Sequence, residues 1–148
     1  MGEQEPAEHR HFDFWIGDWE VRDQDGTLVG HNRIRPLFDG IGLREEWRGV
    51  SGLRGASLNV YAARRGVWHQ TWVDSNGTLL QLDGGLRDGS MVLEGTTPGP
   101  VRHRISWSLV DGDPDRIRQL WETAPDGEDW SVLFDGRYQR TRKADATT

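Results

Sequence analysis

A length of 148 residues predicts a single domain. The 19 Gly and 6 Pro spread along the chain make long helices improbable, because both residue types destabilise helix interiors. Its net charge of −6 argues against nucleic-acid binding, which needs a surplus of Lys and Arg. No apolar run reaches the roughly 20 residues of a membrane-spanning helix, the acidic start lacks a signal-peptide pattern, and there is no Cys for disulfides. We expect one cytoplasmic all-β domain over 1–148, with a core of about 12–141 and no membrane partner.

The chain alternates extended segments with turn dipeptides such as Asp25-Gly26, Asn76-Gly77 and Asp111-Gly112, which easily adopt positive φ in tight hairpins. An open sheet of about ten strands would expose two edges, so we expect a closed, up-and-down antiparallel barrel. The segment 5–15 lacks alternation and is expected to form a short helix or turn closing one end, with a tail at 143–148. The expected strands are 19–22, 29–38, 43–50, 56–63, 67–74, 79–82, 91–95, 102–110, 116–123 and 130–140.

Successive residues of a strand point to opposite faces, so the apolar positions of each strand predict the barrel interior. One strand stays ambiguous, because in 56–63 the pair Leu58 and Val60 competes with Asn59 and Tyr61 for the interior. The expected interior residues of the other strands are Leu43, Glu45, Trp47, Trp68, Gln70, Trp72, Asp74, His103, Ile105, Trp107, Leu109, Ile117, Gln119, Trp121, Trp130, Val132, Phe134 and Tyr138.

This predicted interior is aromatic with a few polar groups, which suits a ligand. A barrel of about ten strands is too wide for side chains to fill, and ligand pockets combine apolar walls with a few orienting polar groups. We expect a small apolar or aromatic molecule to bind there without a cofactor, to a monomer or a homodimer. The expected ligand contacts are Trp47, Asn59, Gln70, Trp72, Trp107, Gln119, Trp121, Phe134 and Tyr138.

Glu45 and His103 are the candidate catalytic residues. A carboxyl and an imidazole in an aromatic cavity can have pKa values close to neutrality and exchange protons with a substrate. Such groups can equally be satisfied by hydrogen bonds to neighbours or water. Two functions therefore stay open: a carrier or sensor that binds without chemistry, and a cofactor-free isomerase, cyclase or hydrolase acting on a natural-product-like substrate.

Other motifs favour no further chemistry. His9 and His11, with Asp13, lack a third fixed metal ligand, so we expect no metal site. Ser57 and Ser75 lack the Gly-x-Ser-x-Gly elbow of serine hydrolases.

The segment HFDFWIGDWEV at 11–21 resembles an uncharacterised bacterial family of calycin-like barrels, related in architecture to lipocalins, fatty-acid-binding proteins and nitrobindins. The resemblance continues through EEW at 45–47, SLNVY at 57–61, WHQTWVD at 68–74, RQLWE at 118–122 and FDGRY at 134–138. It implies a barrel fold and no particular reaction. Trp19 resembles the first-strand Trp of lipocalins, whose indole closes the barrel floor against an Arg of the last strand, which here is Arg140. Nitrobindin-like haem binding would need a His in 130–140, where there is none, leaving only His103 as a candidate.

Overall fold

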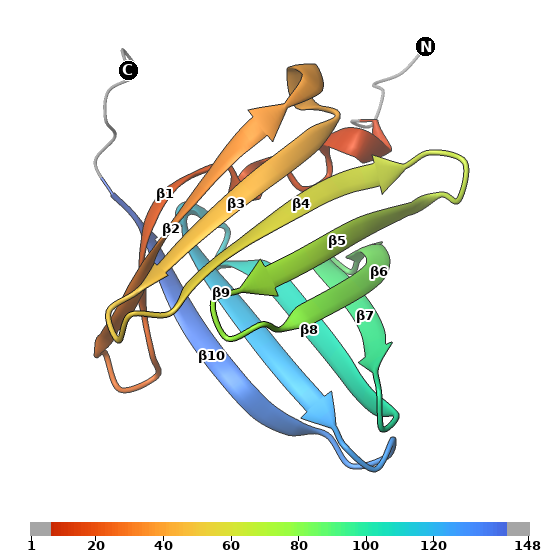
Figure 1. Ribbon diagram of the computed structural model, residues 1–148. Helices are drawn as coiled ribbons and strands as arrows, with labels where there is room; N and C mark the ends of the chain where they lie inside the picture. Colours follow the sequence, from red (N-terminus) through yellow and green to blue (C-terminus); the bar gives the residue numbers. More distant parts are fainter. Residues whose placement is uncertain (1–6, 142–148) are drawn as a thin grey trace.

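In a computed structural model that describes residues 7–141, the chain folds into a closed antiparallel barrel of ten strands (Figure 1). The strands are β1 (Gly17–Arg22), β2 (Leu28–Leu37), β3 (Gly42–Gly49), β4 (Arg54–Ala62), β5 (Val67–Asp74), β6 (Leu79–Arg87), β7 (Ser90–Thr97), β8 (Val101–Val110), β9 (Asp113–Ala124) and β10 (Ser131–Arg140). Each strand pairs with its neighbours in sequence, and β1 pairs with β10 to close the barrel. The predicted fold class is confirmed, while the tail expected at 143–148 lies outside the described residues.

Tight turns of the predicted kind set the pairing of successive strands. Asp88 and Gly89 join β6 to β7 with φ values of 49° and 86°, and Asp111 and Gly112 join β8 to β9 with φ values of 52° and 72°. Two consecutive residues with positive φ make the type I′ turn, whose twist matches that of the strands it connects. The sequence therefore encodes these hairpins locally.

Strand β6 is longer than the expected segment 79–82. The prediction ends this strand at Leu82, whereas in the structure it continues through Gly84 and Gly85 to Arg87. In the structure Gly84 pairs with Leu93 of β7, and a Cβ on Gly84 would collide with the carbonyl oxygen of Val92. Glycine here allows a close approach between two backbones and does not end the strand.

The predicted inward orientation of Trp130 and Val132 is wrong. A β-bulge lies between Val132 and Phe134, where Val132 pairs with Glu122 and Phe134 pairs with Trp121. Because the extra residue reverses the alternation, Phe134 faces inward while Val132 is 58% exposed. Trp130 lies outside the barrel, where the guanidinium of Arg104 is 4.1 Å from the centre of its ring.

The amino-terminal segment closes one end of the barrel, as expected from its lack of alternation (Figure 1). It forms two short 3₁₀ helices, Glu8–Arg10 and Asp13–Trp15. Phe12 and Trp15 stack with ring centroids 4.6 Å apart and are fully buried. The ring of Phe12 also meets the edges of Trp68 and Trp107. Within residues 7–141, no helix is long and apolar enough to cross a membrane.

The predicted contact between Trp19 and Arg140 is confirmed at the same end. The guanidinium carbon of Arg140 lies 4.3 Å from the centre of the Trp19 ring, and the indole donates to the carbonyl oxygen of Trp15 at 2.9 Å. Arg140 also donates to the carbonyl oxygen of Ile16 and to the carboxylate of Asp115, each at 2.9 Å. Stacking of a cation on an indole, together with these hydrogen bonds, fixes the floor of the barrel.

Candidate ligand-binding site

A cavity of about 260 Å³ lies inside the barrel, at the end opposite the amino-terminal segment. Its mouth lies beside Ser51 and Leu53, in the loop between β3 and β4, and beside Leu133. The expected ligand contacts all line this cavity, with the exception of Asn59. The lining residues are Val29, Glu45, Trp47, Gly49, Ser51, Leu53, Gln70, Trp72, Leu80, Ile105, Trp107, Gln119, Trp121, Leu133, Phe134 and Tyr138.

The cavity exists because three aromatic rings pack against glycines of the barrel wall. A Cβ on Gly30 would lie 2.5 Å from Cζ2 of Trp47, and a Cβ on Gly136 would lie 2.6 Å from Cε2 of Phe134. A Cβ on Gly55 would overlap the ring of Trp72. Each ring therefore occupies the space over a residue without a side chain, and part of the lumen stays open.

Glu45 is the central polar group of the cavity. Its side chain is on β3, only 5% of the residue is exposed, and it faces inward as predicted from alternation. The hydroxyl of Ser57 donates to its Oε1 at 2.6 Å, and the amide of Asn32 donates to its Oε2 at 2.8 Å. Both oxygens of the carboxyl thus accept from neutral donors on the two neighbouring strands.

Two hydrogen-bonded arms extend from this centre. On one side Asn59 donates to Ser57 at 2.9 Å, and Gln70 donates to Asn59 at 2.8 Å. This arm resolves the ambiguous strand, because the polar pair Ser57 and Asn59 is buried while Leu58 is 59% exposed. The apolar residues of β4 face outward because Glu45 requires donors on the inner face.

The second arm runs through Asn32 to the last strands of the barrel. The amide of Asn32 donates to the hydroxyl of Tyr138 at 2.8 Å, and that hydroxyl donates to Oε1 of Gln119 at 2.5 Å. Gln70 and Gln119 end the two arms, and both line the cavity. The polar network therefore joins six strands, β5, β4, β3, β2, β10 and β9, and presents an amide to the cavity at each end.

Burial raises the pKa of Glu45, against the opposite effect of the hydrogen bonds from Ser57 and Asn32. The pKa of Tyr138 is also raised, first by burial and then by the charge of Glu45, so the phenol keeps its proton. Within the described part of the chain, the cavity lining contains no Lys, Arg or His. The carboxyl of Glu45 thus has no cationic neighbour in the cavity wall.

His103 does not contact Glu45. Its Nδ1 accepts a hydrogen bond from the indole of Trp121 at 3.2 Å, and its Nε2 lies 3.0 Å from the hydroxyl of Thr97. It does not line the cavity, and burial lowers its pKa. An ion pair would lower the pKa of Glu45 and raise that of His103, whereas the shifts have the opposite signs. The two candidate catalytic residues therefore occupy separate sites: Glu45 lines the cavity, and His103 is bound to the N–H of Trp121 outside the cavity lining.

Sequence reasoning missed Asn32 and Ser57, which hold the carboxyl of Glu45. Alternation along β2 could have placed Asn32 inside the barrel, because Gly30, Asn32 and Ile34 are the alternate buried residues of that strand. Small polar residues carry little weight when alternation is judged from apolar residues alone. Their role follows only from the need to satisfy a buried carboxyl.

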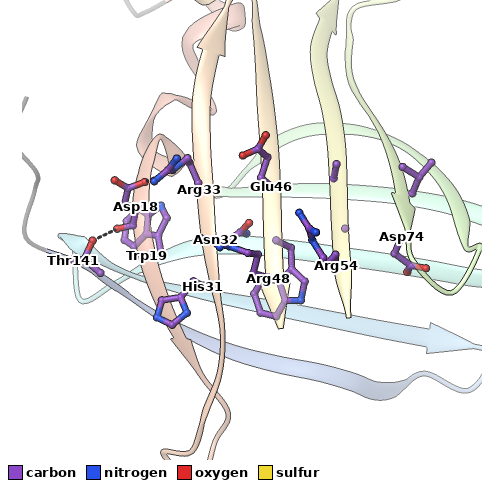
Figure 2. A pocket seen from close by; sticks show the side chains of 14 residues that line it. Asp18, Trp19, His31, Asn32, Arg33, Glu46, Arg48, Arg54, Asp74 and Thr141 are labelled. Atoms are coloured by element: carbon purple, nitrogen blue, oxygen red, sulfur yellow. Dashed lines mark hydrogen bonds and ion pairs between the residues drawn. The ribbon is translucent and has the colours of Figure 1, made fainter. Parts of the chain in front are cut away.

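A larger hollow of about 850 Å³ lies on the outer face of β1 to β5. Figure 2 shows two rows of polar and charged side chains across these strands, one with Arg33 and Glu46 and the other with His31, Arg48 and Arg54. His31 lies opposite Arg48 in the sheet, and Arg48 lies opposite Arg54. Because its charges have both signs and are in contact with solvent, this hollow is a hydrated polar surface.

No protein-family model matches this chain, and no curated protein matches it. Among residues 7–141, no group of three or more His, Asp or Glu side chains is placed to hold a metal ion. A functional assignment must therefore follow from the chemistry of the cavity.

Proposed function

We propose that this protein binds a small hydrophobic or aromatic molecule inside the barrel, as a carrier or sensor. The observation that carries this proposal is the open-ended cavity with walls formed by Trp47, Trp72, Trp121 and Phe134. Burial of apolar surface contributes about 25 cal/mol per Å², so aromatic walls supply most of the affinity for an apolar guest. A closed barrel with an internal cavity is also compatible with the calycin-like family that the sequence resembles.

The amides of Gln70 and Gln119 supply orientation. Each uses one end of its amide in the buried network and reaches the cavity surface. An amide at such a position can accept from a hydroxyl or donate to a carbonyl of the guest. A few fixed polar groups in an apolar wall are the usual means of selecting one guest orientation.

Tryptophan fluorescence tests this proposal, because the walls of the cavity contain indoles. Titration with a panel of small aromatic compounds should give saturable changes for some of them. Trp72→Ala should weaken that binding by about 1–3 kcal/mol, or about 5- to 150-fold. Trp130→Ala is the matched control, since this indole lies outside under Arg104, and it should leave affinity unchanged. The proposal fails if no compound binds saturably, or if both variants weaken binding equally.

Glu45 also supports a second candidate function, a cofactor-free enzyme acting on a cavity-bound, natural-product-like substrate. A buried carboxyl with a raised pKa at a cavity surface can act as a general acid or base toward a bound substrate. In an isomerase, cyclase or hydrolase of this kind, Glu45→Gln should lower turnover by about 10²- to 10⁴-fold while preserving the fold. Recovery of every bound compound unchanged would leave the carrier as the function.

A further inference from the structure

The carboxyl of Glu45 lies in a cavity whose described lining residues carry no positive charge. Ionising a carboxyl away from water is costly unless a counter-charge is present. Ser57 and Asn32 nevertheless direct donors at both of its oxygens, an arrangement that favours the anion. These donors favour the anion while burial opposes it, and the described lining side chains supply no positive charge to balance it.

The aromatic wall next to Glu45 is suited to a cation. Trp47 is on the same face of β3 as Glu45, and Trp72 lies opposite Ser57, the donor to Glu45. A cation within about 6 Å of the face of an indole is attracted by the negative charge of the π-system. Indoles combined with a carboxylate are thus a recognition site for ammonium groups.

Two indoles of the cavity wall, those of Trp72 and Trp121, have their N–H groups hydrogen-bonded to residues outside the cavity lining. Trp72 donates from Nε1 to Oδ2 of Asp74 at 3.0 Å, and Trp121 donates to His103. Burial alone would raise the pKa of Asp74, but hydrogen bonds, first that from Trp72, lower it, so this carboxyl is ionised at neutral pH. Because these N–H groups are occupied, the carbon surface of the rings is what remains for a guest, and the anion bound to Trp72 increases the electron density of its ring.

We propose that the guest of this cavity is a small organic cation, an ammonium group on a compact apolar body, with Glu45 as its counter-ion. This inference rests on the proposed binding function of the cavity. The aromatic rings contact the apolar body and the ammonium, and Glu45 balances the charge. The cavity volume of about 260 Å³ lies just below the roughly 300–1,000 Å³ of pockets for drug-sized ligands, so the body of the guest is small.

A pair of probes with the same shape separates charge from apolar contact. Phenyltrimethylammonium and tert-butylbenzene differ in one atom, a charged nitrogen in place of a carbon, and both can be followed by tryptophan fluorescence. At neutral pH the cation should bind at least tenfold more tightly. Glu45→Gln should abolish that preference and leave the affinity for tert-butylbenzene within about twofold.

Glu46→Gln is the matched control, because Glu46 is the next residue of β3, faces outward and pairs with Arg44. It should leave both affinities unchanged. If tert-butylbenzene binds as tightly as the cation, the cation proposal is overturned while the binding function stands. If neither probe binds saturably and the aromatic panel also fails, both proposals are overturned.

The pH dependence of the wild-type protein gives a readout that does not need a variant. Among the described residues that line the cavity, the other titratable group is Tyr138 on β10, which keeps its proton. Binding of the cation should therefore release up to one proton from Glu45, and the affinity should fall as the pH is lowered through the pKa of that carboxyl. Calorimetry in buffers with different ionisation enthalpies measures the proton release. Cation binding that releases no proton and does not weaken at low pH would exclude Glu45 as the counter-ion.

Discussion

Replacing Glu45 with Gln should change how the stability of the protein depends on pH. Burial raises the pKa of Glu45 in the folded state, so the unfolded chain loses this proton at a lower pH than the folded chain does. Below the pKa of Glu in the unfolded chain, about 4.3, the carboxyl is protonated in both states and its stabilising effect is complete. As the pH rises from that value through the pKa of Glu45 in the folded state, this effect is lost. The free energy of unfolding then falls by up to ~1.4 kcal/mol per pH unit.

The Glu45→Gln variant lacks this titration and keeps most of the contacts. The amide oxygen can still accept from Asn32, and the amide nitrogen can donate to the hydroxyl of Ser57. Its stability should therefore be close to that of the wild type at about pH 4.5 and higher than that of the wild type at about pH 8. Every other titratable group is present in both proteins, so its contribution cancels when the free energy of unfolding of one protein is subtracted from that of the other.

Urea unfolding at several pH values between about 4.5 and 8 measures this difference. Glu46→Gln, on the outer face of the same strand, should follow the wild type across this range, because Glu46 is in contact with solvent and with Arg44. Parallel stability curves for the wild type and Glu45→Gln would refute the reasoning. They would show that Glu45 titrates as an ordinary exposed carboxyl and that the cavity does not separate it from water.

Three further predictions concern the floor, the wall and the surface of the barrel. Trp19→Ala should cost about 3–5 kcal/mol and lower the Tm by more than about 10 °C in calorimetry, and a loss of only one or two degrees would show that the floor contact is peripheral. Gly55→Ala should push the ring of Trp72 into the lumen and weaken ligand binding at least tenfold in fluorescence titrations. Gly85→Ala is the control, because a Cβ there meets open space, and it should leave the affinity unchanged. Equal affinities of the two variants would contradict the account of the wall. Arg118 and Arg137 hold the pKa of Asp135 at about 2, so Asp135→Asn should be less stable than the wild type at pH 7, and the gap should close as the pH falls from about 4 to about 2 in acid titrations.

The turns and the alternation of residues were sufficient to predict the barrel and most of its interior. Asp88-Gly89 and Asp111-Gly112 encode tight hairpins locally, and alternation in β3 placed Glu45 and Trp47 inside. These features depend on neighbours in sequence or on the period of two in a strand. The class of fold could therefore be read from short segments.

Other features depend on contacts between distant residues. The bulge after Val132 is one inserted residue, and nothing in the local sequence marks it. The hydrogen bonds of Ser57 and Asn59 around Glu45 decide which face of β4 points into the barrel. Their stabilisation outweighs the cost of exposing Leu58 to solvent. Alternation also gives a face of the sheet but no position along the barrel axis, so it could not separate His103 from Glu45.

A crystal structure of the protein with phenyltrimethylammonium tests the central claim most directly. The account predicts density for the probe inside the barrel, with its ammonium beside Glu45 and its body against the rings of Trp47 and Trp72. It would be contradicted by side chains that fill the lumen, or by a probe that occupies only the charged outer hollow between Glu46 and Arg54 (Figure 2).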